Sequence, residues 1–324
     1  MIRVLLLAAM AVCWPLESPA ADETRQLVIV VGAAGESQYG SQFAEWADLW
    51  ATAARRSDFG VTLLAGDDGS GSTLESLRDR LTTQADSGEA ELWLVLIGHG
   101  TFDGTDAKFN LVGPDVTASQ FGEWLKMRTG KSVIINCASC SGPFASALTG
   151  ENRIVVTATK SGYEMNFARF GQFLAETIAD PEIDLDKDRQ TSLLEAFIIA
   201  SGRTAEFYAS ESRLATEHAM IEDNSDGLGT PGEWFRGIRV TRVAKDGSSP
   251  DGLRANQVFF VMNELESRLS EAQASQRDEL ESQLEDLRKT KDRLTEDQYY
   301  EQLEVIMLEL ARLYQSVQDG QPAN

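Results

Sequence analysis

Short apolar runs alternate with amphipathic segments through the first half of the chain. Residues 27–31 form a continuous apolar run that ends at Gly32, as expected of a strand buried on both faces of a sheet. In the next segment, large apolar residues recur at helical spacing, from Phe43 and Trp46 to Trp50. This order predicts an α/β fold with a mostly parallel sheet flanked by helices. The other predicted elements are strands at 61–65, 92–97, 132–136 and 153–158, and helices beginning at Thr73 and spanning 118–127 and 168–178.

The pattern changes after residue 180. Periodicity predicts helices at 191–208 and 213–222, and a stretch rich in Gly, Pro and Ser at 227–252 predicts a loop with one short strand at 237–243. The chain is then predicted to be helical from 258 to 317, with two seams of Leu and other large apolar residues on a charged background. Thr295 followed by Gln298 is a capping-box signature that restarts the helix between the seams. We expect a C-terminal helical hairpin or coiled coil, which either packs on the main domain or mediates self-association.

The N-terminus has the pattern of a secretory signal peptide. Arg3 gives a positive start, residues 4–14 form an apolar run too short to span a bilayer, and small residues at Ser18 and Ala20 suit a signal peptidase. Cleavage is expected after Ala20, which predicts a periplasmic or secreted protein. The expected organisation is a signal peptide (1–20), an α/β domain (21–180), a helical extension (181–234), a linker (235–255), a helical hairpin or coiled coil (256–318) and a disordered tail (319–324).

Charge and hydropathy restrict the partners. The formal net charge of −22 disfavours nucleic acid and anionic membrane surfaces, because both would repel this chain. No later stretch is long and apolar enough for a transmembrane helix, so an integral membrane protein is not expected. Cys13 lies in the signal segment, and Val12 before it is bulkier than a lipoprotein site normally accepts. Nucleic acid and membranes are therefore not expected as partners.

Residues suited to nucleophilic chemistry follow two of the predicted strands. His99 comes directly after the strand at 92–97, between Gly98 and Gly100, and the turn 137–142 comes directly after the strand at 132–136. That turn reads Cys-Ala-Ser-Cys-Ser-Gly. Catalytic groups of parallel sheets gather at the carboxyl ends of the strands, and a nucleophile beside an imidazole is the recurring arrangement for acyl transfer. His99 and this turn are therefore the predicted site.

These two motifs resemble those of the caspase, gingipain and legumain group of cysteine peptidases. Residues 131–142 align without a gap with the legumain outline of Lys, an apolar strand, and then Ala-Cys-x-Ser-Gly. The resemblance covers about residues 27 to 180 and implies a caspase-like three-layer sandwich, peptide-bond hydrolysis, and a polypeptide either as substrate or as binding partner. It assigns to His99 the role of assisting the nucleophile and to the N–H of Gly100 the role of holding the oxyanion.

The chain departs from the family at the nucleophile. In the gapless register the nucleophilic cysteine of the family falls on Ser139. Three interpretations stay open: Ser139 is a serine nucleophile, Cys140 serves after a shift of one residue, or the site is inactive and the fold is kept for binding. Cys137 and Cys140 also form a Cys-x-x-Cys pair, which is a possible disulfide or redox-sensitive pair in an oxidising compartment.

Residues 184–195 follow the spacing of an EF-hand loop. Asp184, Asp186 and Asp188 occupy the first three ligand positions, Gln190 would offer its backbone carbonyl, and Glu195 the final bidentate carboxylate. Arg189 stands where a glycine normally makes the turn, and an acidic helix start explains part of the pattern equally well. Calcium is thus the one predicted cofactor. A second acidic turn, Asp-Asn-Ser-Asp-Gly at 223–227, is less specific.

Two functions follow from these patterns. The first is an exported caspase-like or legumain-like cysteine-type peptidase. The second is a catalytically inactive homologue that acts as a binding or scaffold protein, and the feature that divides them is Ser139 at the expected nucleophile position.

Overall fold

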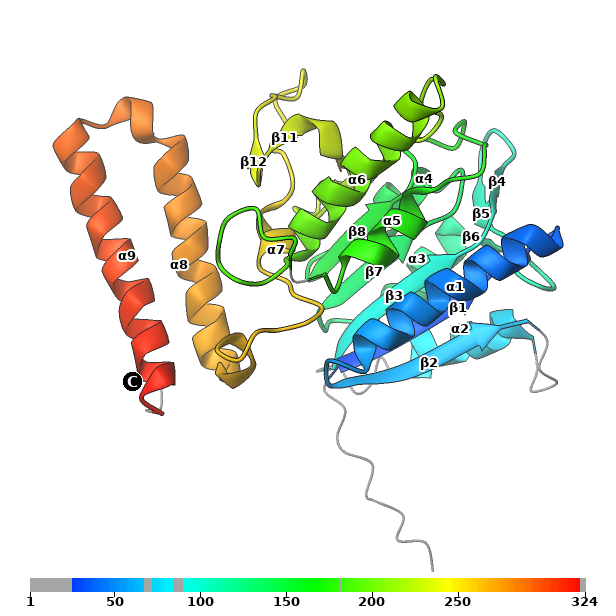
Figure 1. Ribbon diagram of the computed structural model, residues 1–324, viewed down its shortest axis with the longest axis horizontal. Helices are drawn as coiled ribbons and strands as arrows, with labels where there is room; N and C mark the ends of the chain where they lie inside the picture. Colours follow the sequence, from blue (N-terminus) through cyan, green and yellow to red (C-terminus); the bar gives the residue numbers. More distant parts are fainter. Residues whose placement is uncertain (1–24, 67–71, 84–89, 181, 321–324) are drawn as a thin grey trace, which may run out of the picture.

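A seven-stranded sheet forms the centre of the molecule (Figure 1), in the order β10-β9-β8-β7-β3-β1-β2. The computed structural model describes residues 25–66, 72–83, 90–180 and 182–320, so the expected signal peptide and residues 321–324 of the expected tail lie outside the described residues. Strands β8, β7, β3, β1 and β2 run parallel, β9 is antiparallel to β8, and β10 is antiparallel to β9. The strands are β1 (Arg25–Val31), β2 (Phe59–Ala65), β3 (Glu91–Ile97), β7 (Ser132–Asn136), β8 (Arg153–Thr157), β9 (Met220–Glu222) and β10 (Thr230–Pro231).

Helices cover both faces of this sheet. Leu27 and Ile29 of β1 pack with α1 (Ser37–Ala54), α5 (Phe170–Thr177) and α6 (Leu193–Ser210). Val28 and Val30 of the same strand pack with α2 (Thr73–Thr83), α3 (Ala118–Leu125) and α4 (Pro143–Leu148). Successive side chains of a strand point to opposite faces, so burial of both faces requires a continuous apolar run. The predicted α/β fold with a mostly parallel sheet flanked by helices is confirmed.

Short strands complete the domain. A three-stranded sheet of β4 (Gly100–Phe102), β5 (Ala107–Phe109) and β6 (Val116–Thr117) begins directly after His99. A small hairpin of β11 (Phe235–Arg236) and β12 (Arg239–Val240) lies where one short strand was predicted at 237–243.

One predicted helix is wrong and another is wrong in part. Residues 213–222 form an irregular segment and then β9, because Met220 to Glu222 pair with β8 in the sheet and this pairing overrides local helical preference. The chain also remains irregular from 258 to 270 apart from a 3₁₀ turn at Glu266–Arg268. There Phe260 is fully buried in the domain core, and Arg25 of β1 binds the carbonyl oxygens of Phe259 and Phe260. Packing onto the sheet domain thus replaces the start of the predicted helix.

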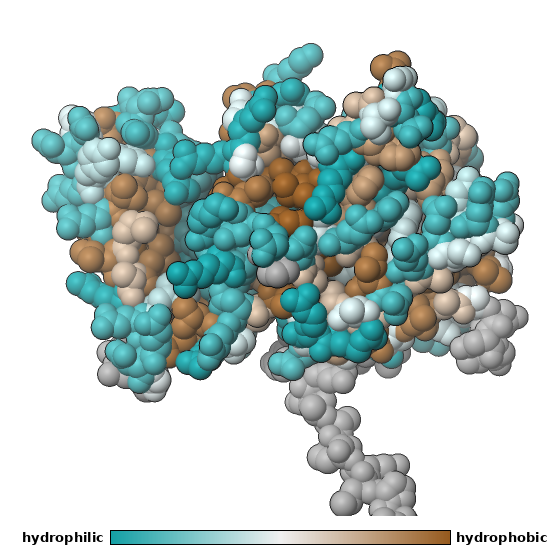
Figure 2. All heavy atoms as spheres, viewed as in Figure 1, coloured by the Kyte–Doolittle hydropathy of each residue, from teal (hydrophilic) through white to brown (hydrophobic). Residues whose placement is uncertain are grey.

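The C-terminal hairpin consists of α8 (Glu271–Lys289) and α9 (Glu296–Gln318) (Figure 1). The predicted restart is confirmed, since Thr295 and Gln298 form a capping box. The two helices bury Leu280, Leu287, Tyr299 and Ile306 between them. Figure 2 shows an apolar stripe on this hairpin, and α9 also carries large exposed apolar side chains, among them Tyr300 and Val305. None of the helices in the described part of the chain is long and apolar enough to cross a membrane.

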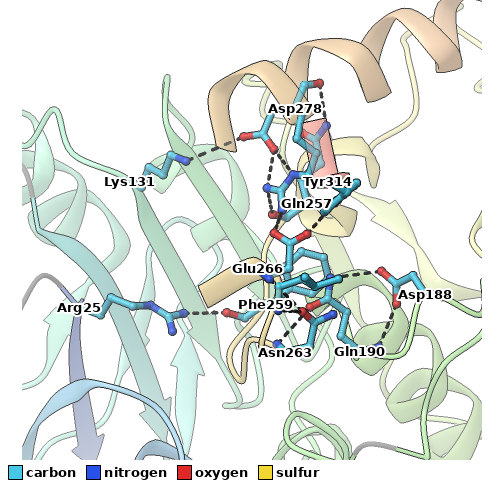
Figure 3. Close-up of polar contacts among 12 residues, drawn as sticks. Arg25, Lys131, Asp188, Gln190, Gln257, Phe259, Asn263, Glu266, Asp278 and Tyr314 are labelled. Atoms are coloured by element: carbon cyan, nitrogen blue, oxygen red, sulfur yellow. Dashed lines mark hydrogen bonds and ion pairs between the residues drawn. The ribbon is translucent and has the colours of Figure 1, made fainter. Parts of the chain in front are cut away.

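A buried ionic network joins the hairpin to the segment before it. Arg277 of α8 is 5% exposed and binds Glu266, which is 7% exposed, as well as Asp278 and the carbonyl oxygen of Gln257. The hydroxyl of Tyr314 in α9 donates to Oε1 of Glu266 at 2.6 Å (Figure 3). Glu266 therefore receives bonds from both helices, and the orientation of the hairpin depends on it.

Replacing Arg277 with Met should lower the free energy of unfolding by about 3–5 kcal/mol, because removal of one partner leaves the other charge buried and uncompensated. Arg268→Met is the matched control, since its ion pair with Glu264 is exposed and should contribute at most about 1 kcal/mol. Urea titrations of the full-length variants, followed by circular dichroism, measure both losses. Equal losses would contradict a structural role for the buried pair.

Candidate active site

Strands β3 and β7 lie side by side and deliver both predicted motifs to the same edge. They pair in parallel with Leu96 opposite Asn136, and the N–H of Cys137 donates to the carbonyl oxygen of Leu96 at 2.9 Å. His99 and the turn 137–142 therefore leave the sheet next to one another. This neighbourhood agrees with the sequence-based prediction.

His99 is held by a backbone carbonyl and an aromatic cage. Its Nε2 lies 3.2 Å from the carbonyl oxygen of Ala34, which follows β1. The rings of Tyr39, Phe43 and Phe167 surround the imidazole, with centroids 4.9, 5.2 and 5.8 Å away. Because a carbonyl oxygen can only accept, this contact assigns the proton to Nε2 and leaves Nδ1 as the nitrogen with a free lone pair.

Gly100 and Ser139 form the closest contact between the two motifs. Ser139 Oγ donates to the carbonyl oxygen of Gly100 at 3.1 Å, and the N–H of Gly100 points back to the same Oγ at 3.3 Å. A Cβ on residue 100 would lie 2.1 Å from the backbone oxygen of Ser139, so this approach requires glycine. Ser139 is 4% exposed, and its hydroxyl is engaged by the backbone of residue 100.

The two thiols lie in different surroundings. Cys137 packs in the core against Gly171 and Trp46, where burial raises its pKa to about 12 and the carboxylate of Glu217 adds to the effect. Burial also raises the pKa of Cys140, although the neighbouring Ser139 hydroxyl opposes this shift. A thiol with a raised pKa is a weak nucleophile at neutral pH. Both thiols are free, so the structure contains no Cys137–Cys140 disulfide.

The turn that carries Ser139 and Cys140 is firmly bonded. Cys140 has a left-handed backbone with φ of +57°, and its N–H donates to the carbonyl oxygen of Glu164 at 2.9 Å. The N–H of Gly142 donates to the Thr159 hydroxyl at 3.0 Å. If the turn shifted by one residue so that Cys140 took the place of Ser139, these hydrogen bonds would break, and each is worth about 1 kcal/mol. The geometry thus favours the gapless register, with Ser139 at the edge facing Gly100.

A second imidazole lies near this turn, and sequence reasoning gave it no role. Nδ1 of His218 is 2.5 Å from Oε1 of Glu164, the residue whose backbone oxygen binds Cys140. His218 precedes β9, a strand whose antiparallel course begins at the carboxyl end of β8. The chain has only two histidines, and this scarcity was the only signal in the sequence that pointed to His218.

The structure brings His99, Gly100 and Ser139 together, keeps Cys140 next to them, and places Cys137 in the core. Within the described ranges, no hydrogen bond joins His99 to Ser139, Cys137 or Cys140. A polar cavity of about 290 Å³ is lined by Tyr39 and Phe167, two of the rings that contact the imidazole of His99. Arg169 and Arg213 line its other side. This cavity offers space for a polar side chain of a bound peptide.

The acidic loop at 184–195 is partly arranged as predicted. Carboxylate oxygens of Asp184, Asp186 and Asp188 lie within 4.8 Å of one another. Arg189 adopts φ of +73°, the left-handed turn that glycine provides in the EF-hand pattern. Burial raises the pKa of Asp188 to about 6, and the charge of Asp186 adds to the shift.

The carboxylate predicted as the final ligand, Glu195, makes other bonds, whereas the side chain of Gln190, predicted to offer only its backbone carbonyl, bonds residues nearby. Glu195 is 1% exposed, accepts from the N–H of Leu185 at 2.5 Å, and forms a capping box with Ser192 at the start of α6. The side-chain amide of Gln190 bonds Asp188, and its side-chain oxygen accepts from the N–H of Asn263. Glu195 therefore serves the helix start, which was the alternative interpretation of this pattern.

Comparisons with known proteins find likenesses of structure only. No protein-family profile and no curated protein matches the sequence. The initiator caspase Dronc of Drosophila shares 13% identity at a TM-score of 0.41, over 64% of this chain and 82% of that one. Caspase-1 of Spodoptera frugiperda shares 11% at 0.41, over 62% and 86%, and a protein of Geobacter sulfurreducens shares 14% at 0.37, over 55% and 89%. Similarity at this level transfers no activity to this chain.

Replacing Gly100 with Ala should cost about 1–3 kcal/mol of stability, because the added Cβ cannot fit against the Ser139 carbonyl without moving the turn. Gly202→Ala is the matched control, since nothing lies within 4 Å of its Cβ position and it is on the exposed face of α6. That change should instead stabilise the helix by about 0.5–1 kcal/mol. Thermal and urea denaturation compare the two, and a Gly100→Ala protein as stable as the parent would contradict the close approach.

Proposed function

We propose that this chain is a caspase-like hydrolase of peptide bonds with His99 as its base. The observation that carries the proposal is the fixed imidazole of His99, whose Nε2 is held by the Ala34 carbonyl and which leaves the sheet at the end of β3, next to the strand β7 that leads into the Ser139 turn. Its ring orientation is set by the aromatic cage before any substrate binds. A positioned base of this kind contributes about 10²–10⁴-fold to acyl transfer.

Ser139 is the nucleophile that the geometry favours. Its Oγ lies 3.3 Å from the N–H of Gly100, the donor assigned to the oxyanion by the family resemblance. In the reaction, Oγ rotates away from the Gly100 carbonyl, gives its proton to Nδ1 of His99 and bonds to the substrate carbonyl carbon. The amine then leaves with that proton, and water hydrolyses the acyl-enzyme. Cys140 could replace Ser139 only after its bonds to Glu164 and its burial are lost.

A binding protein without activity is the second candidate. It is favoured by the two hydrogen bonds that tie the Ser139 hydroxyl to Gly100, because these occupy both the nucleophile and the oxyanion donor. In that case the edge of the sheet and the polar cavity beside His99 bind a polypeptide without cleaving it.

We further propose that the protein is exported and that residues 184–195 bind calcium. The apolar run at 4–14, followed by Ser18 and Ala20, supports export. The three clustered aspartates and the left-handed Arg189 support the calcium loop.

A fluorophosphonate probe tests the catalytic proposal. The full-length protein should be labelled at Ser139, with labelling lost in Ser139→Ala and reduced about 100-fold or more in His99→Ala. Peptide mapping by mass spectrometry identifies the labelled residue. If the parent protein is labelled no faster than the His99→Ala variant, the result would support a binding protein without activity. Labelling of Cys140 by a thiol-directed electrophile in a His99-dependent manner would instead make the enzyme a cysteine peptidase.

Calcium titration by calorimetry tests the acidic loop. Asp186→Asn should weaken one class of calcium site at least about tenfold, since the charge count of the ligands sets affinity. Glu182→Gln, an exposed change of the same charge just before the loop, should leave binding unchanged. Equal calcium binding by the two variants would show that residues 184–195 do not form a calcium site.

Intact mass of the protein recovered from the exported fraction tests the signal peptide. The chain should begin at Ala21, after cleavage behind Ala20. A mass that includes residues 1–20 would contradict this prediction.

A further inference from the structure

Three carboxylates from separate segments converge at the end of strand β9. Glu222 ends this strand, Asp226 lies in the turn to β10, and Asp251 precedes α7 (Leu253–Asn256). One carboxylate oxygen of each lies within 4.8 Å of the others. Glu222 is 0% exposed and Asp251 is 3% exposed, whereas Asp226 is open to solvent. Two buried acidic groups and one accessible one therefore share a small volume.

No positive side chain compensates these charges. Across residues 25–66, 72–83, 90–180 and 182–320, no Arg, Lys or His forms an ion pair with Glu222, Asp226 or Asp251. Asp251 accepts from the N–H of Asp223 at 2.8 Å and from the Thr230 hydroxyl at 2.8 Å. These bonds fix its carboxylate in place but add no full charge. Buried carboxylates are normally paired with a cation or bound to a metal.

The side chain of Glu222 provides a second line of evidence, besides the clustering, that a ligand is missing. Its Oε1 accepts a bond of 3.4 Å from the N–H of Gly227. Its Oε2 is buried and makes no hydrogen bond of normal geometry, although the hydroxyl of Thr149 is its neighbour. A buried carboxyl oxygen without a hydrogen-bond partner is costly, and native proteins rarely keep one without a purpose.

We propose that Glu222, Asp226 and Asp251 bind a divalent cation of the calcium type. The ligand set contains only oxygen, which calcium prefers and which zinc and copper sites seldom use alone. With Ca–O distances of about 2.4 Å, two ligands on opposite sides of the ion are about 4.8 Å apart, so the carboxylates can all reach it. Water completes the shell on the side that Asp226 leaves open.

This site connects the β9–β10 turn to α4. The hydroxyl of Ser225 donates to the carbonyl oxygen of Gly150 at 2.9 Å, and Gly227 lies against Ser146 and Thr149. Helix α4 begins directly after Gly142, the end of the turn that carries Ser139. The bound cation thus stabilises the edge that supports the candidate active site, and it takes no part in chemistry. The site is independent of both the proposed activity and the acidic loop at 184–195.

Calorimetric titration of the full-length protein with CaCl₂ tests this site. Asp226→Asn removes the accessible ligand, and because Asp226 is exposed the fold should persist. Asp246→Asn is the matched control, an exposed aspartate outside the cluster. Asp226→Asn should lose one calcium equivalent or at least about tenfold in affinity, whereas Asp246→Asn should bind as the parent does.

The same comparison can be followed by thermal unfolding. Calcium should raise the Tm of Asp246→Asn more than that of Asp226→Asn, because only the former keeps all the ligands. Identical stoichiometry, affinity and Tm shift in the two variants would overturn the proposal. The loop at 184–195 is intact in both proteins, so its own behaviour does not affect the comparison.

Discussion

Parallel pairing of β3 with β7 is the constraint on which the rest of the site depends. The two strands are buried on both faces, so a shift of one residue would turn every side chain of one strand to the opposite core. With Leu96 opposite Asn136, the histidine turn and the Cys/Ser turn emerge together. The register that satisfies both cores thus also sets the distance between Gly100 and Ser139.

Around this pairing, backbone groups position most of the site. The Ala34 carbonyl selects the tautomer of His99, the Gly100 backbone binds the Ser139 hydroxyl, and the Glu164 carbonyl holds the N–H of Cys140. Backbone groups move little, so the site is preorganised. In the proposed reaction the Ser139 hydroxyl starts in a hydrogen-bonded state, and substrate binding must release it.

The sequence predicted the five parallel strands of the sheet because their apolar runs are distinct. Continuous apolar runs such as 27–31 and 92–97 fit a strand covered on both faces, and glycines after them mark the turns of the site. The same logic predicted His99, Gly100 and the turn at 137–142 at one edge. It could not predict where individual side chains point, and so it could not place the Cys137 thiol in the core or the Ser139 hydroxyl on Gly100.

The wrong predictions also have physical causes that the local sequence does not record. Strand β9 and the irregular segment around Phe260 are set by pairing and packing with residues far away in the chain, which local periodicity does not record. Arg189 departs from the glycine of the EF-hand pattern, yet its backbone adopts the left-handed turn. Glu195 fits the last ligand position and equally a capping box, and the two roles share one sequence signature.

The thiol introduced by Ser139→Cys in a Cys140→Ser background reports directly on whether His99 acts on position 139. Cys137 should not be alkylated, because its thiol is buried. Its pKa, read from the pH dependence of alkylation, should be lower with His99 than with His99→Gln by about 1 unit or more, since an imidazolium within about 4–6 Å stabilises the thiolate. Equal pKa values in the two proteins would contradict a functional pair at this edge of the sheet.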